Sequence, residues 1–159
     1  MTENITTHEL IDLILKPGVR LVDVRPVEAY NGWTLNNEQR GGHKRKKKSL
    51  PAKWLQYIDW IEMVRKKQIH PGQTIVVYGY ENDEAEAVAK RFRQSGYDNV
   101  ITYHHFKDEW SANADLPMQK LEKFHKLVSA DWVNQLNSGE KPPHYDNHKF
   151  VIVHAHYRN

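Results

Sequence analysis

One segment limits the fold of this chain more than any other. Residues 74–78 read Thr-Ile-Val-Val-Tyr, without the alternation of a strand that has one solvated face. Such a continuous run is typical of a parallel strand that is buried on both faces. After a short polar loop, residues 82–94 carry a helical pattern that ends before Gly96, a residue well placed for a helix cap. A buried strand followed by a helix predicts an α/β domain.

The same alternation of strand and helix patterns continues on both sides of this segment. Thr6 and Glu9 have capping-box spacing and open a short helix pattern that ends at Pro17-Gly18. Because helices that connect parallel strands cover both faces of a sheet, we expect an α/β fold with a central, mostly parallel sheet. Further strands are predicted at residues 20–24, 49–50 and 99–103, and further helices at 26–30, 52–67, 106–112 and 117–127.

The end of the chain repeats the pattern of its beginning. Residues 128–136 resemble the opening helix, and Phe150-Val151-Ile152-Val153 resembles the first strand. Such a short segment cannot bury a core alone, and an unpaired apolar strand would be an aggregation hazard. We therefore expect one domain over residues 1–125, followed at 126–159 by the truncated start of a second repeat. Its strand should pair with the first sheet or with another chain.

None of the 159 residues is a cysteine. This absence removes disulfides, thiolate metal sites and thiol nucleophiles together. The first residues lack the basic and then apolar pattern of a secretory signal, and no apolar run approaches the roughly 18 residues that a membrane span needs. We expect a cytoplasmic protein without a membrane segment.

A run of positive charge without any acid lies at residues 40–48. Burying several unpaired lysines would be costly, so we expect this segment to turn into water. No aromatic residue or helical period accompanies the charges, which favours a solvated loop. The alternative is a binding module in which this run engages nucleic acid or another polyanion. The candidate residues are Arg40, Lys44, Arg45, Lys46, Lys47 and Lys48.

Six segments between residues 21 and 110 resemble, in order, the landmarks of a rhodanese-like domain. The two-copy layout is similar to tandem-domain thiosulfate and mercaptopyruvate sulfurtransferases, in which the first domain is usually a non-catalytic partner. The resemblance implies a rhodanese-like α/β fold, no cofactor, and a second rhodanese domain or another copy of the chain as partner. The segments are Leu21-Val22-Asp23-Val24-Arg25-Pro26-Val27-Glu28-Ala29-Tyr30, Arg40-Gly41-Gly42-His43, Ser49-Leu50-Pro51, Ile75-Val76-Val77-Tyr78, Gly96-Tyr97-Asp98-Asn99-Val100 and Trp110.

The resemblance also implies where a nucleophile would stand. In the family a cysteine follows the strand that corresponds to residues 74–78, and here that place is held by Gly79. The loop then carries carboxylates that a helix N-terminus favours but that would repel an anionic sulfur donor. We expect a sulfurtransferase-family module that is inactive as this chain, with any persulfide chemistry of a parent protein on a cysteine beyond Asn159. The degenerate loop consists of Gly79, Tyr80, Glu81, Asn82, Asp83 and Glu84.

Two rim residues and one histidine pair complete the candidates. Asp23 and Arg25 leave a strand at its carboxyl end, the edge where α/β sheets present ligands. We expect a structural role for both, with Arg25 pairing with a carboxylate such as Glu28. His154 and His156 share one face of the last predicted strand, but a metal site needs a third ligand. Surface or hydrogen-bonded histidines are the expectation there.

Overall fold

The computed structural model describes residues 3–44 and 47–155. Arg45, Lys46 and His156, which belong to the predicted polyanion and metal sites, lie outside the described residues. The chain divides into two compact units, Met1–Leu127 and Val128–Asn159. Each unit is described below by itself. No helix in the described ranges is long and apolar enough to cross a membrane.

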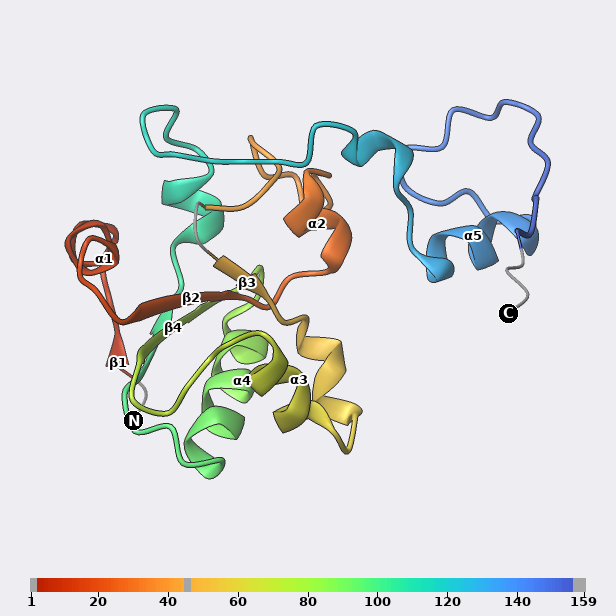
Figure 1. Ribbon diagram of the computed structural model, residues 1–159. Helices are drawn as coiled ribbons and strands as arrows, with labels where there is room; N and C mark the ends of the chain where they lie inside the picture. The colour runs from red at the N-terminus through yellow and green to blue at the C-terminus, as the bar shows by residue number, and fades with distance from the viewer. Residues whose placement is uncertain (1–2, 45–46, 156–159) are drawn as a thin grey trace. The chain divides into compact units, whose positions relative to one another are not determined.

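The first unit is built on a parallel sheet that has five strands in the described residues (Figure 1). The strand order is β1-β5-β4-β2-β3, and every neighbouring pair is parallel. The predicted α/β class is therefore confirmed. The sequence did not predict β1, because two residues are too short to show a pattern. The strands are β1 (Glu3–Asn4), β2 (Val19–Asp23), β3 (Lys47–Ser49), β4 (Thr74–Tyr78) and β5 (Val100–Tyr103).

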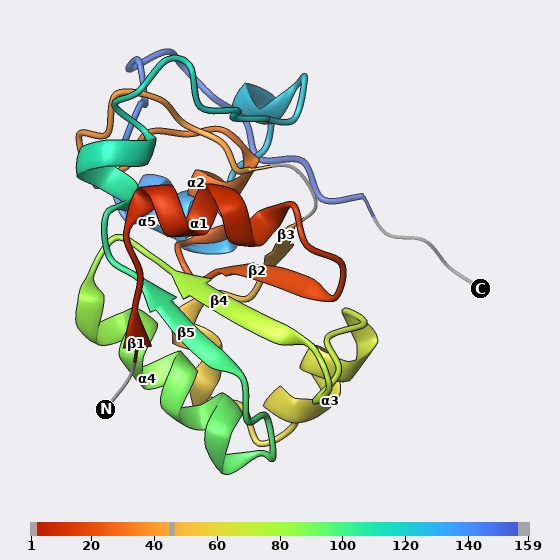
Figure 2. The same cartoon turned by 90° about the vertical axis from the view of Figure 1, so that its left-hand side faces the viewer.

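Helices cover both faces of this sheet, as Figures 1 and 2 show together. On one face, α3 (Trp60–Lys66) and α4 (Asn82–Gln94) contribute Trp60 and Phe92, whose rings meet edge to face at 5.0 Å. On the other face, α1 (Thr7–Ile14) packs beside the turn of helix η2 (Phe106–Trp110). Successive residues of β4 point to opposite faces, so this strand contributes to both cores. The double covering explains why β4 has no polar face.

Short helices begin where the sequence predicts them. The capping box of α1 is formed: the Glu9 amide donates to Thr6 Oγ1 at 3.2 Å, and the Thr6 amide donates to the Glu9 carboxylate at 2.8 Å. This reciprocal pairing satisfies two amides that lack a partner within the helix. The predicted helix at 26–30 is present as α2 (Val27–Asn31), and α4 has the predicted bounds.

The predicted long helix at 52–67 is wrong. The segment forms a 3-10 turn, η1 (Ala52–Gln56), and then α3, with Tyr57 in an extended conformation between them. A continuous helix would place Ile58 on the apolar face predicted from the sequence. The break instead buries Trp60 completely and leaves Ile58 99% exposed. Burial of the larger indole side chain accounts for this local change of direction.

The predicted helix at 117–127 is also wrong, since only η3 (Phe124–Lys126) is helical there. His43 and Gln119 exchange two backbone hydrogen bonds of 2.6 Å in an antiparallel bridge. The Leu121 amide donates to the Asn31 carbonyl at 2.8 Å. The backbone groups therefore pair with residues far away in sequence and are not available for helical bonds.

The second unit contains one helix in its described part, α5 (Ala130–Asn137), which Ser129 caps by accepting from the Trp132 amide. The strand predicted at 150–153 is not formed in the described residues, and its side chains are between 48% and 86% exposed. A strand needs a neighbouring strand for its backbone groups, and this unit supplies none among residues 128–155. Pairing of this segment with another chain stays a prediction.

Replacing Phe92 by Ala tests the helical core of the first unit. Phe92 is fully buried and contacts the rings of Trp60 and Tyr97. Its loss leaves a cavity, so we expect the free energy of unfolding to fall by about 3–5 kcal/mol in urea titration. Ile58→Ala is the control, because Ile58 is exposed and should change stability by less than about 0.5 kcal/mol. Equal effects of the two changes would contradict the described packing.

Candidate functional site

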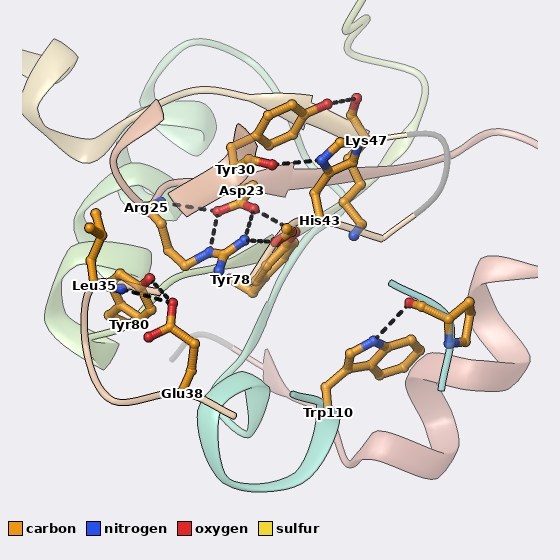
Figure 3. A network of polar contacts seen from close by, with 12 residues as sticks. Asp23, Arg25, Tyr30, Leu35, Glu38, His43, Lys47, Tyr78, Tyr80 and Trp110 are labelled. Atoms are coloured by element: carbon orange, nitrogen blue, oxygen red, sulfur yellow. Dashed lines mark hydrogen bonds and ion pairs between the residues drawn. The ribbon is translucent and has the colours of Figure 1, made fainter. Parts of the chain in front are cut away.

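A buried ion pair lies at the carboxyl end of β2 (Figure 3). Asp23 and Arg25 are both inaccessible to solvent, and the guanidinium binds the carboxylate through Nε at 2.9 Å and Nη2 at 2.6 Å. Arg25 therefore pairs with a carboxylate, as predicted, but the carboxylate is that of Asp23 and not that of Glu28. Nη2 also donates to the Gly42 carbonyl at 2.6 Å. The pair thus joins the end of β2 to the loop that precedes β3.

The sheet register places Tyr78 beside this pair. Asp23 and Tyr78 are opposite each other in the ladder between β2 and β4, so their side chains share one face. The Tyr78 hydroxyl donates to Asp23 Oδ2 at 2.8 Å. Burial, followed by the Asp23 charge, raises the pKa of Tyr78 well above its ordinary value. Tyr78 is therefore a neutral hydrogen-bond donor in this site.

Aromatic rings enclose the Arg25 guanidinium. Its central carbon lies 4.2 Å from the Phe106 ring centre and 5.3 Å from the Tyr80 ring centre. Burial alone would lower the pKa of Arg25, but the charge of Asp23, the hydrogen bonds to Asp23 and the nearby Tyr78 and Tyr80 together outweigh burial and raise it. The guanidinium is therefore a permanent buried cation, held by a carboxylate and by ring faces.

Two lysines of the basic run lie in the same interior, contrary to the expectation of a solvated loop. Lys44 is 1% exposed and Lys47 is 6% exposed. Lys44 Nζ lies 3.1 Å from the Trp110 ring centre and 4.7 Å from that of Tyr103. Lys47 begins β3 opposite Leu21 and faces the same core. Aromatic ring faces attract cations and therefore offset part of the free-energy cost of burying these lysines. The sequence gives no sign that these rings lie near the lysines.

The side chain of Arg40 also binds backbone groups of this chain. Its guanidinium donates to the backbone carbonyls of Trp110 at 2.8 Å, Ser111 at 2.9 Å and Leu116 at 2.9 Å, and also to that of Asn113. Arg40 therefore fixes the turn that follows η2. Lys48, another residue of the predicted polyanion site, is half-buried and lies on the opposite side of β3 from Lys47. Polyanion binding by residues 40–48 stays a prediction.

The loop after β4 is shaped by close packing. A side-chain carbon at Gly79 would lie 2.7 Å from Val24 Cγ2, a distance shorter than a normal contact. The next residue, Tyr80, donates its hydroxyl to Glu38. The Glu38 carboxylate also accepts from the amides of Leu35 at 3.3 Å and Asn36 at 2.8 Å. The loop is thereby tied to residues 35–38, a link for which the sequence offers no signal.

Beside this loop is an open depression of about 520 Å³. The predicted loop residues Tyr80, Glu81, Asn82 and Asp83 line it together with Asp108 and two basic groups, His104 and Lys107. His104 contacts Glu86 at 3.0 Å, and Lys107 donates to Asn36. Burial and the neighbouring charges of Asp83 and Glu81 raise the pKa of Glu84. The acidic lining does not favour an anionic sulfur donor.

The histidines do not form a metal site in the part of the chain that the structure describes. No group of three or more His, Cys, Asp or Glu residues is placed to hold a metal ion there. His154 is exposed, and its predicted partner His156 is outside the described residues. His105 lies 3.3 Å from Glu109, which also accepts a hydrogen bond from Thr7.

Residues 6–113 match the model of the rhodanese-like domain. The chain belongs to the rhodanese-like family. Its ordered sequence landmarks and its parallel sheet agree with this membership. The chain is 24% identical, over 134 residues, to the thiosulfate sulfurtransferase YnjE of Escherichia coli K12, covering 82% of this chain and 29% of that protein.

Solved structures give a stronger similarity. The anaerobic ergothioneine biosynthesis enzyme from Chlorobium limicola, in complex with its natural substrate trimethyl histidine, is 48% identical with a TM-score of 0.87. A structure of EanB with ergothioneine covalently linked with a persulfide cysteine has the same identity and TM-score. Each alignment covers 100% of this chain and 37% of the other chain. This rhodanese-like chain therefore spans well under half the length of the relatives that it matches.

The Lys44→Met variant tests the buried lysine in the rhodanese-like unit. Burial lowers the pKa of Lys44 well below its ordinary value of 10.5, so the unfolded chain binds more protons and wild-type stability rises with pH up to that value. Removing the charge should increase the free energy of unfolding at pH 7 by about 1–3 kcal/mol, because desolvation outweighs the cation–π contact.

The measurement is urea unfolding between pH 7 and pH 9 in a chloride buffer. The advantage of the Lys44→Met variant should shrink as pH rises toward the pKa of the unfolded lysine. Lys48→Met is the matched control on the opposite face of β3, with an expected change below about 0.5 kcal/mol. Destabilisation by Lys44→Met alone would show that the ammonium group is favourable in the fold.

Proposed function

We propose that this chain is a non-catalytic rhodanese-like module that acts beside a cysteine-bearing domain in a sulfur-transfer protein. One observation carries the proposal: Gly79 follows β4 where the family resemblance implies a cysteine, and the chain contains no cysteine. Covalent sulfur transfer needs a thiolate that becomes a persulfide. Such a thiolate must come from another domain or another protein.

The geometry of the loop supports a structural role. Gly79 is packed against Val24, Tyr80 is bonded to Glu38, and the adjoining depression is lined by Glu81, Asp83 and Asp108. These contacts hold the loop in place, and the three carboxylates of the depression outnumber its lysine, Lys107, which does not favour an anionic donor. The buried Asp23–Arg25 pair stabilises the same edge of the sheet from within.

The relatives suggest which reaction the module serves. The structures that align with the whole chain at 48% identity are those of an ergothioneine biosynthesis enzyme, seen with trimethyl histidine and with a persulfide cysteine. We therefore assign the module to a parent protein that transfers sulfur to a trimethylated histidine. Residues 128–159 are then the start of a second rhodanese-like repeat, and the partner is a further rhodanese domain or another copy. We place this protein in the cytoplasm, where thiols remain reduced.

The chain of residues 1–159 should not transfer sulfur. With thiosulfate and cyanide, thiocyanate formation should equal the protein-free blank, because no thiolate is present to carry the sulfur. A cysteine-bearing thiosulfate sulfurtransferase assayed in parallel is the positive control. Thiocyanate formation clearly above the blank, in proportion to protein concentration, would overturn the proposal.

Introducing a cysteine at the expected position should not create an efficient enzyme. The Gly79→Cys side chain meets Val24, so we expect a loss of about 1–3 kcal/mol in unfolding free energy. Gly72→Cys is the matched control, since a side-chain carbon at Gly72 meets nothing within 4 Å. Both variants should form thiocyanate at similar, near-blank rates. A rate for Gly79→Cys far above that of Gly72→Cys would show that the loop is still competent for catalysis.

A further inference from the structure

Three cationic groups gather around one tyrosine ring in the interior of the first unit. The Tyr78 ring centre lies 5.8 Å from the guanidinium carbon of Arg25, 5.4 Å from Lys44 Nζ and 5.3 Å from Lys47 Nζ. Arg25 Nη1 and both lysine Nζ atoms are buried, and none has a hydrogen-bond partner in the described part of the chain. Buried donors of this kind are rare, because each loses its hydration without replacement.

Among the described residues, Asp23 supplies the carboxylate beside these cations, and it has no capacity left for the lysines. Asp23 Oδ1 accepts from the Arg25 amide at 3.1 Å and from Arg25 Nε at 2.9 Å. Asp23 Oδ2 accepts from Arg25 Nη2 at 2.6 Å and from the Tyr78 hydroxyl at 2.8 Å. A carboxylate offers about four acceptor positions, and here all four are used. When protonated, the two lysines are therefore two positive charges without a counter-charge.

The nearest other buried acid does not supply that counter-charge. Glu38 is bonded to the Tyr80 hydroxyl and to the amides of Leu35 and Asn36. Tyr78 donates to Asp23, and the pKa of Tyr103 is raised to about 12, first by burial, so neither hydroxyl ionises near neutral pH. Within residues 3–44 and 47–155, the charge of the protonated lysines therefore stays uncompensated.

We infer that Arg25, Lys44 and Lys47 form a binding site for a small oxyanion with two negative charges, the class that includes thiosulfate, sulfate and hydrogen phosphate. Such an ion would accept hydrogen bonds from the three free donors and would balance the two excess charges. Charge-assisted bonds of this kind are about twice as strong as neutral ones. The rings of Tyr78, Tyr103 and Trp110 would enclose the ion and exclude water.

This site differs from the loop after β4. It lies on the face of the sheet covered by α1 and η2, whereas the loop leads into α4 on the other face. The site uses side chains from the end of β2 and the start of β3, and it needs no thiolate. The inference therefore goes beyond the proposed function, and it holds or fails independently of sulfur transfer.

Binding should be coupled to proton uptake. Burial lowers the pKa of both lysines well below their ordinary values, and for Lys47 the nearby charge of Lys44 adds to the effect. A dianion between them reverses this preference, so affinity should increase as pH falls from 9 to 7. The other groups that face the lysines are Asp23 at the end of β2, Arg25 after it, Tyr78 on β4, Tyr103 on β5, and His43 before Lys44. Burial lowers the pKa of His43, which therefore stays neutral in this range.

Isothermal titration calorimetry of the whole chain tests the site. Sodium thiosulfate, sulfate and phosphate are titrated separately at pH 7.5, with sodium chloride at matched ionic strength as the blank. We expect binding of one dianion per chain and no saturable heat with chloride. Repeating the titration in buffers of different ionisation enthalpy should show net proton uptake. The order of the three affinities tells whether the ion is a sulfur or a phosphorus oxyanion.

Variants locate the ion. Lys44→Met and Lys47→Met keep an apolar stem of similar length and should still fold, because replacing a buried charge by an apolar group is often neutral or stabilising. Each should weaken binding by about tenfold or more, as expected for one charge-assisted hydrogen bond. Lys48→Met changes the net charge equally but lies on the opposite face of β3, so it should bind as the wild type does.

Two results would overturn the inference. One is the absence of saturable binding of all three dianions to the wild-type chain. The other is equal affinity of the wild type, Lys44→Met and Lys47→Met, which would place any bound ion elsewhere. Thermal unfolding of the wild type in millimolar thiosulfate against matched chloride gives a reading that needs no variant, and an equal melting temperature would count against the site.

Discussion

The polar contacts at the carboxyl edge of the sheet depend on the carboxylate of Asp23. It stands in a ladder between β2 and β4, so its position is set by backbone hydrogen bonds, and its four acceptor positions bind Arg25 and Tyr78. Through Arg25 it also fixes the Gly42 carbonyl. Because a buried guanidinium cannot lose its proton, this edge tolerates no loss of the acid.

The same edge carries the features on which the proposed non-catalytic role rests. The loop after β4 is held by packing at Gly79 and by the hydrogen bond from Tyr80 to Glu38. The buried lysines, Lys44 and Lys47, lie on the other side of β4. The chain thus has the parallel sheet of a rhodanese-like domain, and the polar side chains at this edge bind one another in its interior. A cysteine alone would not restore the missing environment, since the surroundings of a thiol determine its reactivity.

Sequence reasoning predicted the layers well and the polar interior poorly. β4 and α4 were predicted with their bounds, because continuous apolar runs and helix caps are local signals. Trp60 was missed, since a break at Tyr57 changes which side of the segment faces the core. The sequence predicts Lys44 and Lys47 in water, because it does not show that the rings of Tyr103 and Trp110 lie beside Lys44 or that the Tyr78 ring lies beside both lysines. Contacts between distant segments account for each of these errors.

The strand β1 has a consequence for the order of events during synthesis. Glu3 pairs with Ile101, and Asn4 with Thr102, so the first strand of the chain completes the sheet only beside the last one. During synthesis β1 cannot pair until β5 has left the ribosome, which requires nearly the whole first unit to have been made. Pairing over so long a separation slows folding and leaves β5 as an open edge in the interval. The nascent chain is therefore most exposed to association with other chains shortly before the first unit is complete.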